Sequence, residues 1–169
     1  MMNWSAIADL DTASKLFVME TVPLAEKERG ILFDLIKKGP PVVSIKALSM
    51  LTKDELLETV PSLTRRTALR PYLARACAIL GNEAEPLLEG FLDDESEYVR
   101  KAALQIAGRL KLVGLENKIR RMTHQQRIAR YAVMALRDMG ADVREYREHP
   151  DALVRELFDE RTRRSRFFA

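Results

Sequence analysis

One feature restricts the fold of this chain more than any other: four short segments of the same pattern recur along it. They begin at Val43, Leu73, Val99 and Ile128, so successive segments start 30, 26 and 29 residues apart. In each segment, a small residue follows four positions after the first residue and an apolar residue seven positions after it. Residues with this spacing lie on one face of an α-helix. The repeat therefore predicts a stack of similar helical units.

A second apolar stripe stands before each repeated segment, which indicates that every unit is a pair of helices. These partner helices are expected at residues 23–38, 54–69, 84–92 and 115–123. The second of them contains Pro61, and a proline inside a helix removes a backbone hydrogen bond. We therefore expect that helix to bend or break at Pro61.

Prolines and glycines stand where such helices would begin or end. Pro41 and Pro71 occupy equivalent places just before the first two repeated segments, where a first-turn proline costs no hydrogen bond. The glycines near the expected helix ends are Gly39, Gly81, Gly114 and Gly140. Two further helices, at residues 12–21 and 150–162, are expected to cap the stack, because terminal repeats would otherwise expose an apolar side.

The third repeat, FLDDESEYVRKAALQIAG at residues 91–108, resembles the HEAT-repeat signature: an apolar helix end, an acidic turn, then Val-Arg and a helix of small residues. The period near 30 is similar to that of the short HEAT-like repeats named after phycobilisome lyases. In that family an acidic residue of the turn commonly pairs with the arginine, which implies a contact of Asp93 or Asp94 with Arg100. The resemblance says almost nothing about function.

The resemblance implies an all-α, armadillo-like fold, a right-handed α-α superhelix (solenoid) of about four HEAT-like hairpins. We expect a single domain over residues 1–169. Within it, residues 1–22 would hold an N-terminal cap helix, residues 23–140 the repeats, and residues 141–169 a C-terminal cap helix and a basic tail.

Composition indicates a globular cytoplasmic protein. Hydrophobic residues make up 47% of the chain, which is enough for a continuous core. The single cysteine, Cys77, has no partner for an internal disulfide, which fits a reducing compartment, and we expect it to be buried in an apolar helix. No apolar stretch approaches the ~20 residues that cross a bilayer, so we expect no membrane insertion.

One face of the repeated helices is predicted to bind a partner. Residues opposite the buried face of the third repeat, carried across the other repeats, give three rows. The rows are Ile45, Arg75, Lys101 and Arg130; Ser49, Ile79, Gln105 and Met134; and Thr52, Asn82, Gly108 and Arg137. The first and third contain four cations and no acid. Neighbouring helices pack about 8–10 Å apart, so Arg75, Lys101 and Arg130 would form a ladder.

The predicted binding residues on this concave face are Arg75, Lys101, Gln105, Arg130, Met134 and Arg137. A basic strip with some apolar character suits an acidic, amphipathic protein segment or a phosphate backbone. An alternative is that these cations only keep the surface solvated.

The C-terminus adds a basic run of Arg161, Arg163, Arg164 and Arg166, followed by two phenylalanines. Three interpretations stay open for it: an unattached end, a docking peptide, or an electrostatic contact to nucleic acid or an anionic membrane.

No catalytic or metal-binding pattern is recognisable. His124 and His149 stand in different turns and lack ligand spacing with Cys77, so we interpret both as turn or cap residues. Some HEAT-like proteins remove alkylated bases from DNA with aromatic residues and a carboxylate on the concave face, and others attach bilins. The three rows contain neither an acid nor an aromatic residue, and nothing marks a bilin site. We predict a protein that is not an enzyme and holds no metal or cofactor.

The prediction that follows is a protein-binding scaffold, adaptor or regulatory subunit with an acidic or amphipathic protein segment on its basic concave face. The alternative is a nucleic-acid-binding protein that uses the same strip and the Arg-rich tail, in which case affinity would fall steeply with salt. Self-association is a further option, because Trp4, Ile7 and Leu10 are expected at the surface.

Overall fold

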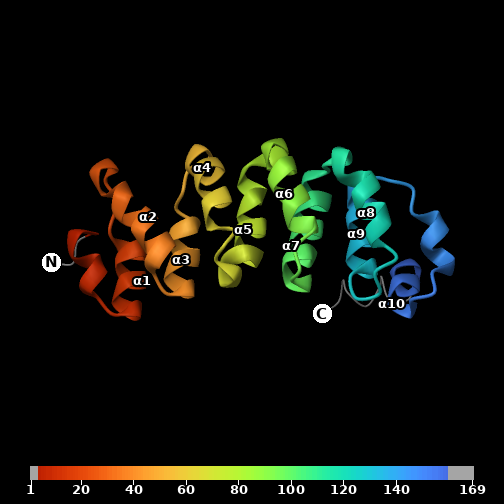
Figure 1. Cartoon of the computed structure of the whole chain (residues 1–169), viewed down its shortest axis with the longest axis horizontal. Coiled ribbons are helices and arrows are strands. Elements are labelled where there is room, and N and C mark those ends of the chain that lie inside the picture. Colours follow the sequence, from red (N-terminus) through yellow and green to blue (C-terminus); the bar gives the residue numbers. More distant parts are fainter. Residues whose placement is uncertain (1–3, 160–169) are drawn as a thin grey trace. The chain divides into compact units, whose positions relative to one another are not determined.

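The computed structural model describes residues 4–159, except for the side chain of Lys27. These residues fold into α-helices and short 3₁₀-helices, and none of them forms a β-strand (Figure 1). The prediction of an all-α fold is thus confirmed. The chain divides into two compact units, Met1–Ala76 and Cys77–Ala169.

The first unit is built from helices that cover one another's apolar sides. Its α-helices are α1 (Thr12–Thr21), α2 (Arg29–Lys38), α3 (Pro41–Leu48), α4 (Lys53–Leu63) and α5 (Arg70–Ala76). Its 3₁₀-helices are η1 (Trp4–Asp9), η2 (Glu26–Glu28) and η3 (Thr67–Leu69). The helix α3 is central, because it contacts α1, α2 and α5.

The N-terminal helix η1 completes the core of the first unit instead of lying on its surface. Trp4 and Ile7 are fully buried, and η1 contacts α1 and α2. The indole Nε1 of Trp4 donates a hydrogen bond to the carbonyl oxygen of Val22 over 3.1 Å. The expectation of surface positions is therefore wrong for Trp4 and Ile7, while Leu10 is half-buried.

The helix α4 is not broken at Pro61. It begins with a capping box, in which the side chains of Thr52 and Glu55 each bond the other's backbone N–H. It then continues through Pro61 to Leu63. Pro61 has no backbone N–H and so removes one hydrogen bond of the helix. Because it stands near the end of the helix, few residues come after this lost hydrogen bond. The interruption comes after Leu63, later than the sequence suggested.

The second unit contains two helix pairs followed by a C-terminal segment. Its α-helices are α6 (Glu85–Leu92), α7 (Glu97–Leu110), α8 (Glu116–Met122), α9 (Ala129–Met139) and α10 (Ala152–Arg155). Its 3₁₀-helices are η4 (Cys77–Ile79), η5 (Gly81–Ala84), η6 (Val113–Leu115), η7 (Arg144–Glu148) and η8 (Glu156–Phe158). In place of the continuous helix expected at residues 150–162, the structure has the short helices α10 and η8, and residues 160–162 lie outside the described residues.

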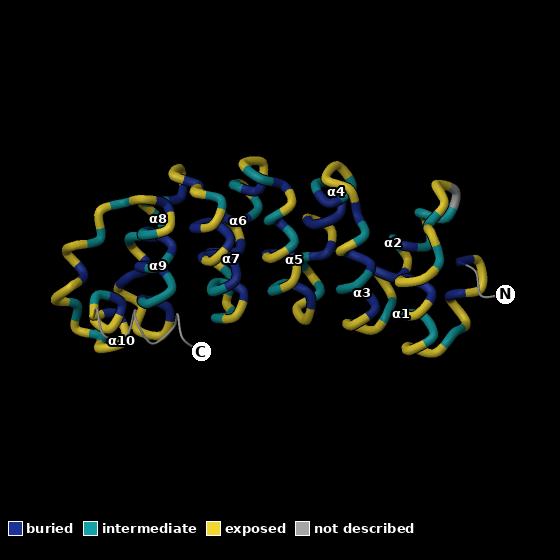
Figure 2. Tube along the Cα trace, turned by 180° about the vertical axis from the view of Figure 1, so that it is seen from behind, coloured by how far each residue is buried: buried dark blue, intermediate teal, exposed yellow. Residues whose placement is uncertain are grey.

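Packing within the second unit follows the sequence repeat. The helix α6 packs on α7 and α8 on α9, and the two pairs meet through α7 and α9. Buried residues recur along each of these helices, with exposed residues between them (Figure 2). This alternation is typical of helices that bury one stripe and present the other to solvent.

Candidate protein-binding face on α7 and α9

Most of the predicted binding residues lie on α7 and α9, which pack against each other in the second unit. One expectation about their packing is wrong: Gly108, placed in an exposed row, is buried against Ala135 of α9. The missing side chain allows a close approach of the two helices. We define the α7–α9 face as Tyr98, Lys101, Gln105, Tyr131, Met134 and Arg137.

Lys101 connects the two helices. Its Nζ forms an ion pair with the carboxylate of Glu97, one turn earlier on α7. The same Nζ lies 4.9 Å from the ring centroid of Tyr131 on α9. A cation at this distance is attracted by the negative face of the ring. Lys101 is therefore a fixed part of the face rather than a freely solvated side chain.

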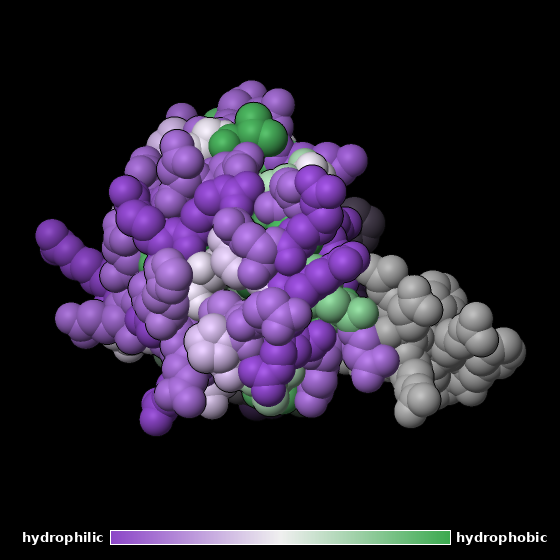
Figure 3. All heavy atoms as spheres, turned by 90° about the vertical axis from the view of Figure 1, so that its right-hand side faces the viewer, coloured by the Kyte–Doolittle hydropathy of each residue, from purple (hydrophilic) through white to green (hydrophobic). Residues whose placement is uncertain are grey.

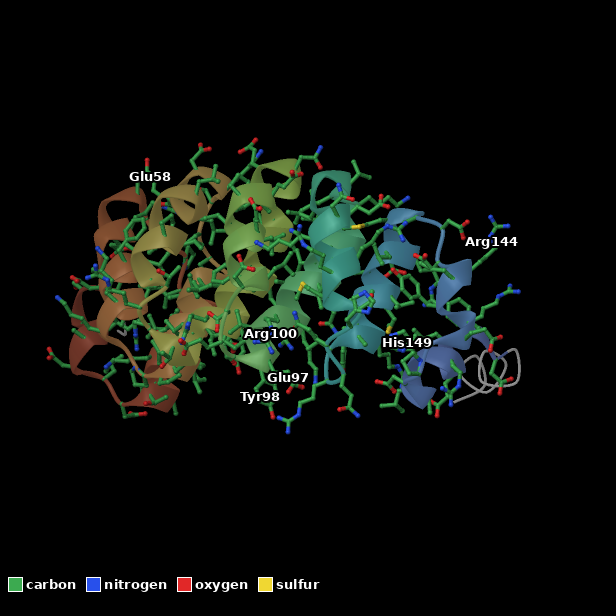
Figure 4. The ribbon with its side chains drawn as sticks, turned by 45° about the vertical axis from the view of Figure 1, so that its right-hand side comes forward. Glu58, Glu97, Tyr98, Arg100, Arg144 and His149 are labelled. Carbon is green, nitrogen blue, oxygen red and sulfur yellow. The ribbon has the colours of Figure 1, made fainter. Side chains whose placement is uncertain are left out.

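An acidic residue, Glu97, lies beside the basic strip, although the three rows predicted from the sequence contain no acid. Besides its pair with Lys101, Glu97 approaches Arg127, with 3.9 Å between Oε2 and Nη1. The hydrogen bond from Lys101 lowers the pKa of Glu97, and the charges of Lys101, Arg127 and Arg100 lower it further. Glu97, Tyr98 and Arg100 gather at the start of α7 (Figure 4). Glu97 thus neutralises part of the positive charge at this end of the face.

The other predicted residues of the second unit differ in their surroundings. Arg130 lies 3.8 Å from the carboxylate of Glu156 in η8. Gln105 is exposed, whereas Met134 and Arg137 are half-buried. Within residues 4–159, the guanidinium of Arg137 has no hydrogen-bond or ion-pair partner. Arg137 is therefore a cation of the face that remains available to a ligand.

Two groups of predicted residues lie outside this arrangement. Arg75 is an exposed residue of α5 in the first unit, and its guanidinium carbon lies 5.9 Å from the ring centroid of Tyr72. Since Arg75 and Lys101 belong to different units, the basic ladder stays a prediction. The basic tail, Arg161, Arg163, Arg164 and Arg166, falls outside the described residues.

The implied contact of the acidic turn with Arg100 takes a particular form. Nη1 of Arg100 donates to the backbone carbonyl oxygens of Asp94 at 2.6 Å and Glu95 at 3.0 Å. The carboxylate of Asp94 accepts a hydrogen bond from the backbone N–H of Ser96, and Asp93 pairs with Lys118 of α8. The side chain of Arg100 therefore holds the turn before α7 by binding the backbone carbonyl groups of that turn. This fixes the start of the α7–α9 face.

One surface position did not stand out in the sequence, namely the residue directly before the first buried residue of α3, α5 and α7. Val42 in α3, Tyr72 in α5 and Tyr98 in α7 hold this position. Their exposed fractions are 57%, 39% and 78%. Exposed large apolar side chains at one repeat position are informative, because such residues are more often buried. Aligning the residue in front of each repeated segment is the signal that finds them.

The two histidines line the same cavity, although the sequence placed them in unrelated turns. The cavity lies in the second unit, has a volume of about 560 Å³ and also contacts Tyr146 and Glu148. His149 is held through both ring nitrogens: Nδ1 accepts a hydrogen bond from the N–H of Asp151 and Nε2 lies 3.1 Å from the carbonyl oxygen of Thr123. Because Nδ1 accepts, Nε2 carries the proton and donates. These bonds indicate a structural role for His149.

Residues 4–159 contain no group of three or more His, Cys, Asp or Glu placed to hold a metal ion. None of the described helices combines the length and the apolar character needed to span a membrane. The side of the molecule toward α8 and α9 is largely hydrophilic, with a few small hydrophobic areas (Figure 3).

Comparison with protein-family models, with curated proteins and with solved structures found no match for this chain. The α7–α9 face is therefore identified by its own residues: a fixed Lys101–Tyr131 contact, an exposed Tyr98, a half-buried Met134 and the unpaired guanidinium of Arg137.

Proposed function

We propose that the protein is a non-catalytic binding module, a scaffold, adaptor or regulatory subunit, that holds an acidic or amphipathic protein segment on the α7–α9 face. In this proposal the helix pairs are HEAT-like repeats of a right-handed solenoid, and the protein works in the cytoplasm. The observation that carries the proposal is the exposed Tyr98 beside the Lys101–Tyr131 contact on two closely packed helices.

The composition of the face supports a protein partner. Tyrosine, methionine and arginine are enriched in protein–protein interfaces relative to the rest of the surface, and tyrosine and arginine are frequent among the residues that dominate binding energy. The α7–α9 face presents Tyr98, Tyr131, Met134 and Arg137 together. Because α7 and α9 are already fixed against each other, binding has to order few side chains, which reduces its entropic cost.

The charges of the face favour an amphipathic segment over a uniformly acidic one. Glu97 already pairs with Lys101, and Glu156 lies near Arg130. Arg137 is left for a carboxylate of the partner, and the side chain of Arg127 is 86% exposed. A segment with apolar side chains and one or two carboxylates complements this distribution.

The same charges argue against nucleic acid as the first choice. A phosphate backbone would approach the carboxylates of Glu97 and Glu156 as well as the cations. Binding to phosphates releases counterions, so its affinity falls by orders of magnitude as salt rises. Salt dependence therefore separates the two functions.

Site-specific photo-crosslinking tests the proposal. The photoreactive amino acid p-benzoylphenylalanine replaces Tyr98, the native protein is irradiated in cells, and crosslinked proteins are identified by mass spectrometry. We expect a defined partner to be crosslinked from position 98, and Arg137→Glu to reduce its yield about tenfold, which corresponds to ~1.4 kcal/mol.

Two controls sharpen this experiment. Arg121→Glu makes the same charge change at an exposed residue of α8 and should leave the yield unchanged. The photoreactive residue at Val113, 66% exposed in η6, should not capture the same partner. The proposal fails if positions 98 and 113 capture the same proteins, or if position 98 captures nucleic acid in a salt-sensitive manner.

A further inference from the structure

Three exposed large side chains stand at matching positions of neighbouring helices in the first unit. Phe17 of α1, Val42 of α3 and Tyr72 of α5 each precede the first buried residue of their helix. Phe17 is 56% exposed, Val42 57% and Tyr72 39%. The helix α3 contacts both α1 and α5, so the three helices that carry these residues pack in one layer (Figure 1). We call these three residues the apolar row.

An ion pair shows that two members of the apolar row face the same side. The Nζ of Lys46 in α3 lies 3.3 Å from the Oε1 of Glu20 in α1. Glu20 follows Phe17 by three positions, and Lys46 follows Val42 by four. Residues three or four apart are neighbours on a helix surface. Phe17 and Val42 therefore lie one turn from the ion pair, on the surface that it bridges.

Among the charged residues one turn from the apolar row, one cation is available to bind a ligand. Lys46 and Glu20 neutralise each other. Arg75, three positions after Tyr72 on α5, is exposed, and its guanidinium lies near the ring of Tyr72 but forms no hydrogen bond or ion pair with a described residue. A guanidinium binds a carboxylate strongly. The complement of this surface is a segment with apolar side chains and an acidic residue.

Helix spacing determines the form of that segment. Packed helices lie about 8–10 Å apart, which sets the distance between successive members of the row. A helix rises 1.5 Å per residue, so residues seven positions apart on one face of a partner helix lie about 10.5 Å apart. Residues two apart on one face of an extended strand lie only about 6.6 Å apart. A helix laid across α1, α3 and α5 matches the row better than a strand does.

We propose that the apolar row is a docking surface for an amphipathic α-helix of a partner protein, which places apolar residues i, i+7 and i+14 on Phe17, Val42 and Tyr72 and a carboxylate on Arg75. This surface belongs to the first unit, whereas the α7–α9 face belongs to the second. Its use goes beyond the proposed function, which concerns the α7–α9 face alone.

Three labelled peptides of equal length test the proposal with the full chain. The first carries leucines at i, i+7 and i+14 and glutamates beside the last leucine, the second replaces these glutamates with lysines, and the third is a shuffled version of the first. Fluorescence anisotropy measures the dissociation constants. We expect the first peptide to bind at least tenfold more tightly than either of the others.

Protein variants locate the binding. Phe17→Ser and Val42→Ser should each weaken the first peptide at least fivefold, whereas Val113→Ser, which removes a similarly exposed side chain in the second unit, should have no effect. Arg75→Glu should invert the preference between the glutamate and lysine peptides. Circular dichroism should show the same helical content for all variants, because the replaced side chains are largely exposed.

Several outcomes overturn this proposal. Equal binding of the patterned and shuffled peptides, or an unchanged dissociation constant in Val42→Ser, excludes helix docking on the row. Concentration-dependent dimerisation of the protein alone, abolished by Phe17→Ser in sedimentation velocity, assigns the row to a second copy of this chain instead. Crosslinking from position 98 tests the proposed function and does not depend on these results. Either proposal can therefore fail while the other stands.

Discussion

A Cβ atom on Gly108 would stand 2.8 Å from the Cα of Ala135, which leaves no room for a side chain between α7 and α9. The next contact, at 3.1 Å, is with the carbonyl oxygen of Ala135. Both are backbone atoms, so the clash of Gly108→Ala is relieved only by moving a helix. We expect a loss of stability of about 1–3 kcal/mol from overpacking, despite the higher helix propensity of alanine. Urea denaturation followed by circular dichroism measures it.

Gly90→Ala is the matched control for this substitution. Gly90 lies inside α6, and no atom stands within 4 Å of the position of its Cβ. Alanine is favoured over glycine in a helix interior by about 0.5–1 kcal/mol, so this variant should be more stable than the original protein. Equal effects of the two substitutions would show that α7 and α9 are not in such close contact.

A half-buried ion pair in the first unit makes stability depend on acidic pH. The guanidinium of Arg29 in α2 hydrogen-bonds the carboxylate of Glu55 in α4, and this bond lowers the pKa of Glu55 from 4.5 to about 2. A carboxyl with a lowered pKa stabilises the folded state at pH values above its unfolded pKa. That stabilisation should be lost as the pH falls from about 4.5 to about 2. The free energy of unfolding, measured by urea titration across this range, checks the expectation.

Arg29→Met should weaken this dependence, because the hydrogen bonds of Thr52 to Glu55 remain. At neutral pH we expect a cost of about 1.5–3 kcal/mol, the range for a hydrogen bond to a charged group, with a smaller further loss between pH 4.5 and 2 than in the original protein. Lys38→Met is the control, because the pair of Lys38 with Asp34 is largely exposed, and exposed pairs contribute about 0–1 kcal/mol. A variant with an unaltered pH profile contradicts the assignment to Glu55.

Arg66 joins the end of one helix to the start of another in the first unit. Its guanidinium donates hydrogen bonds to the carbonyl oxygens of Ile36 and Gly39 and to the hydroxyl of Ser44. A lysine cannot reproduce this planar set of donors. Arg66→Lys should therefore destabilise the protein by about 1–3 kcal/mol, because part-buried carbonyl groups lose their donors.

The neighbouring residue provides the control. Arg65→Lys alters an exposed side chain, and such surface substitutions usually stay within about 0.5 kcal/mol. Thermal unfolding monitored by circular dichroism compares the two variants directly. A melting temperature equal to that of Arg65→Lys would mean that Arg66 does not hold the turn between α2 and α3 in solution.

The repeat in the sequence predicted which residues form the core. Val43, Leu73, Val99 and Ile128, the first residues of the four repeated segments, are all fully buried. This success has a local cause: the spacing of apolar residues along one helix decides which side is buried, whatever that side contacts. The all-α fold and most helix positions follow from the same local periodicity.

The sequence did not predict properties that depend on contacts between two distant segments. A helical wheel of α7 alone places Gly108 opposite the core, but α9 covers that side as well. The wheel also cannot show that Glu97, on a different row, shares its carboxylate with Lys101 and Arg127. The candidate residues of the second unit do lie on helices, but their surroundings are less basic and less open than the rows of the sequence predict. Trp4 shows the same effect, since its burial depends on α1 and α2.

Cys77 offers a chemical measure of opening in the second unit. Burial raises the pKa of its thiol from 9.0 to about 12. Each pKa unit changes the ionised fraction tenfold, so the native thiolate population at pH 8 is about a thousandfold below that of an exposed cysteine. Alkylation by iodoacetamide at pH 8, followed by mass spectrometry, should be at least a hundredfold slower in the native protein than in concentrated urea. Rapid native alkylation would contradict the burial of η4, whereas a slow rate that increases in Gly108→Ala would show that the contact of α7 with α9 also protects the adjoining η4.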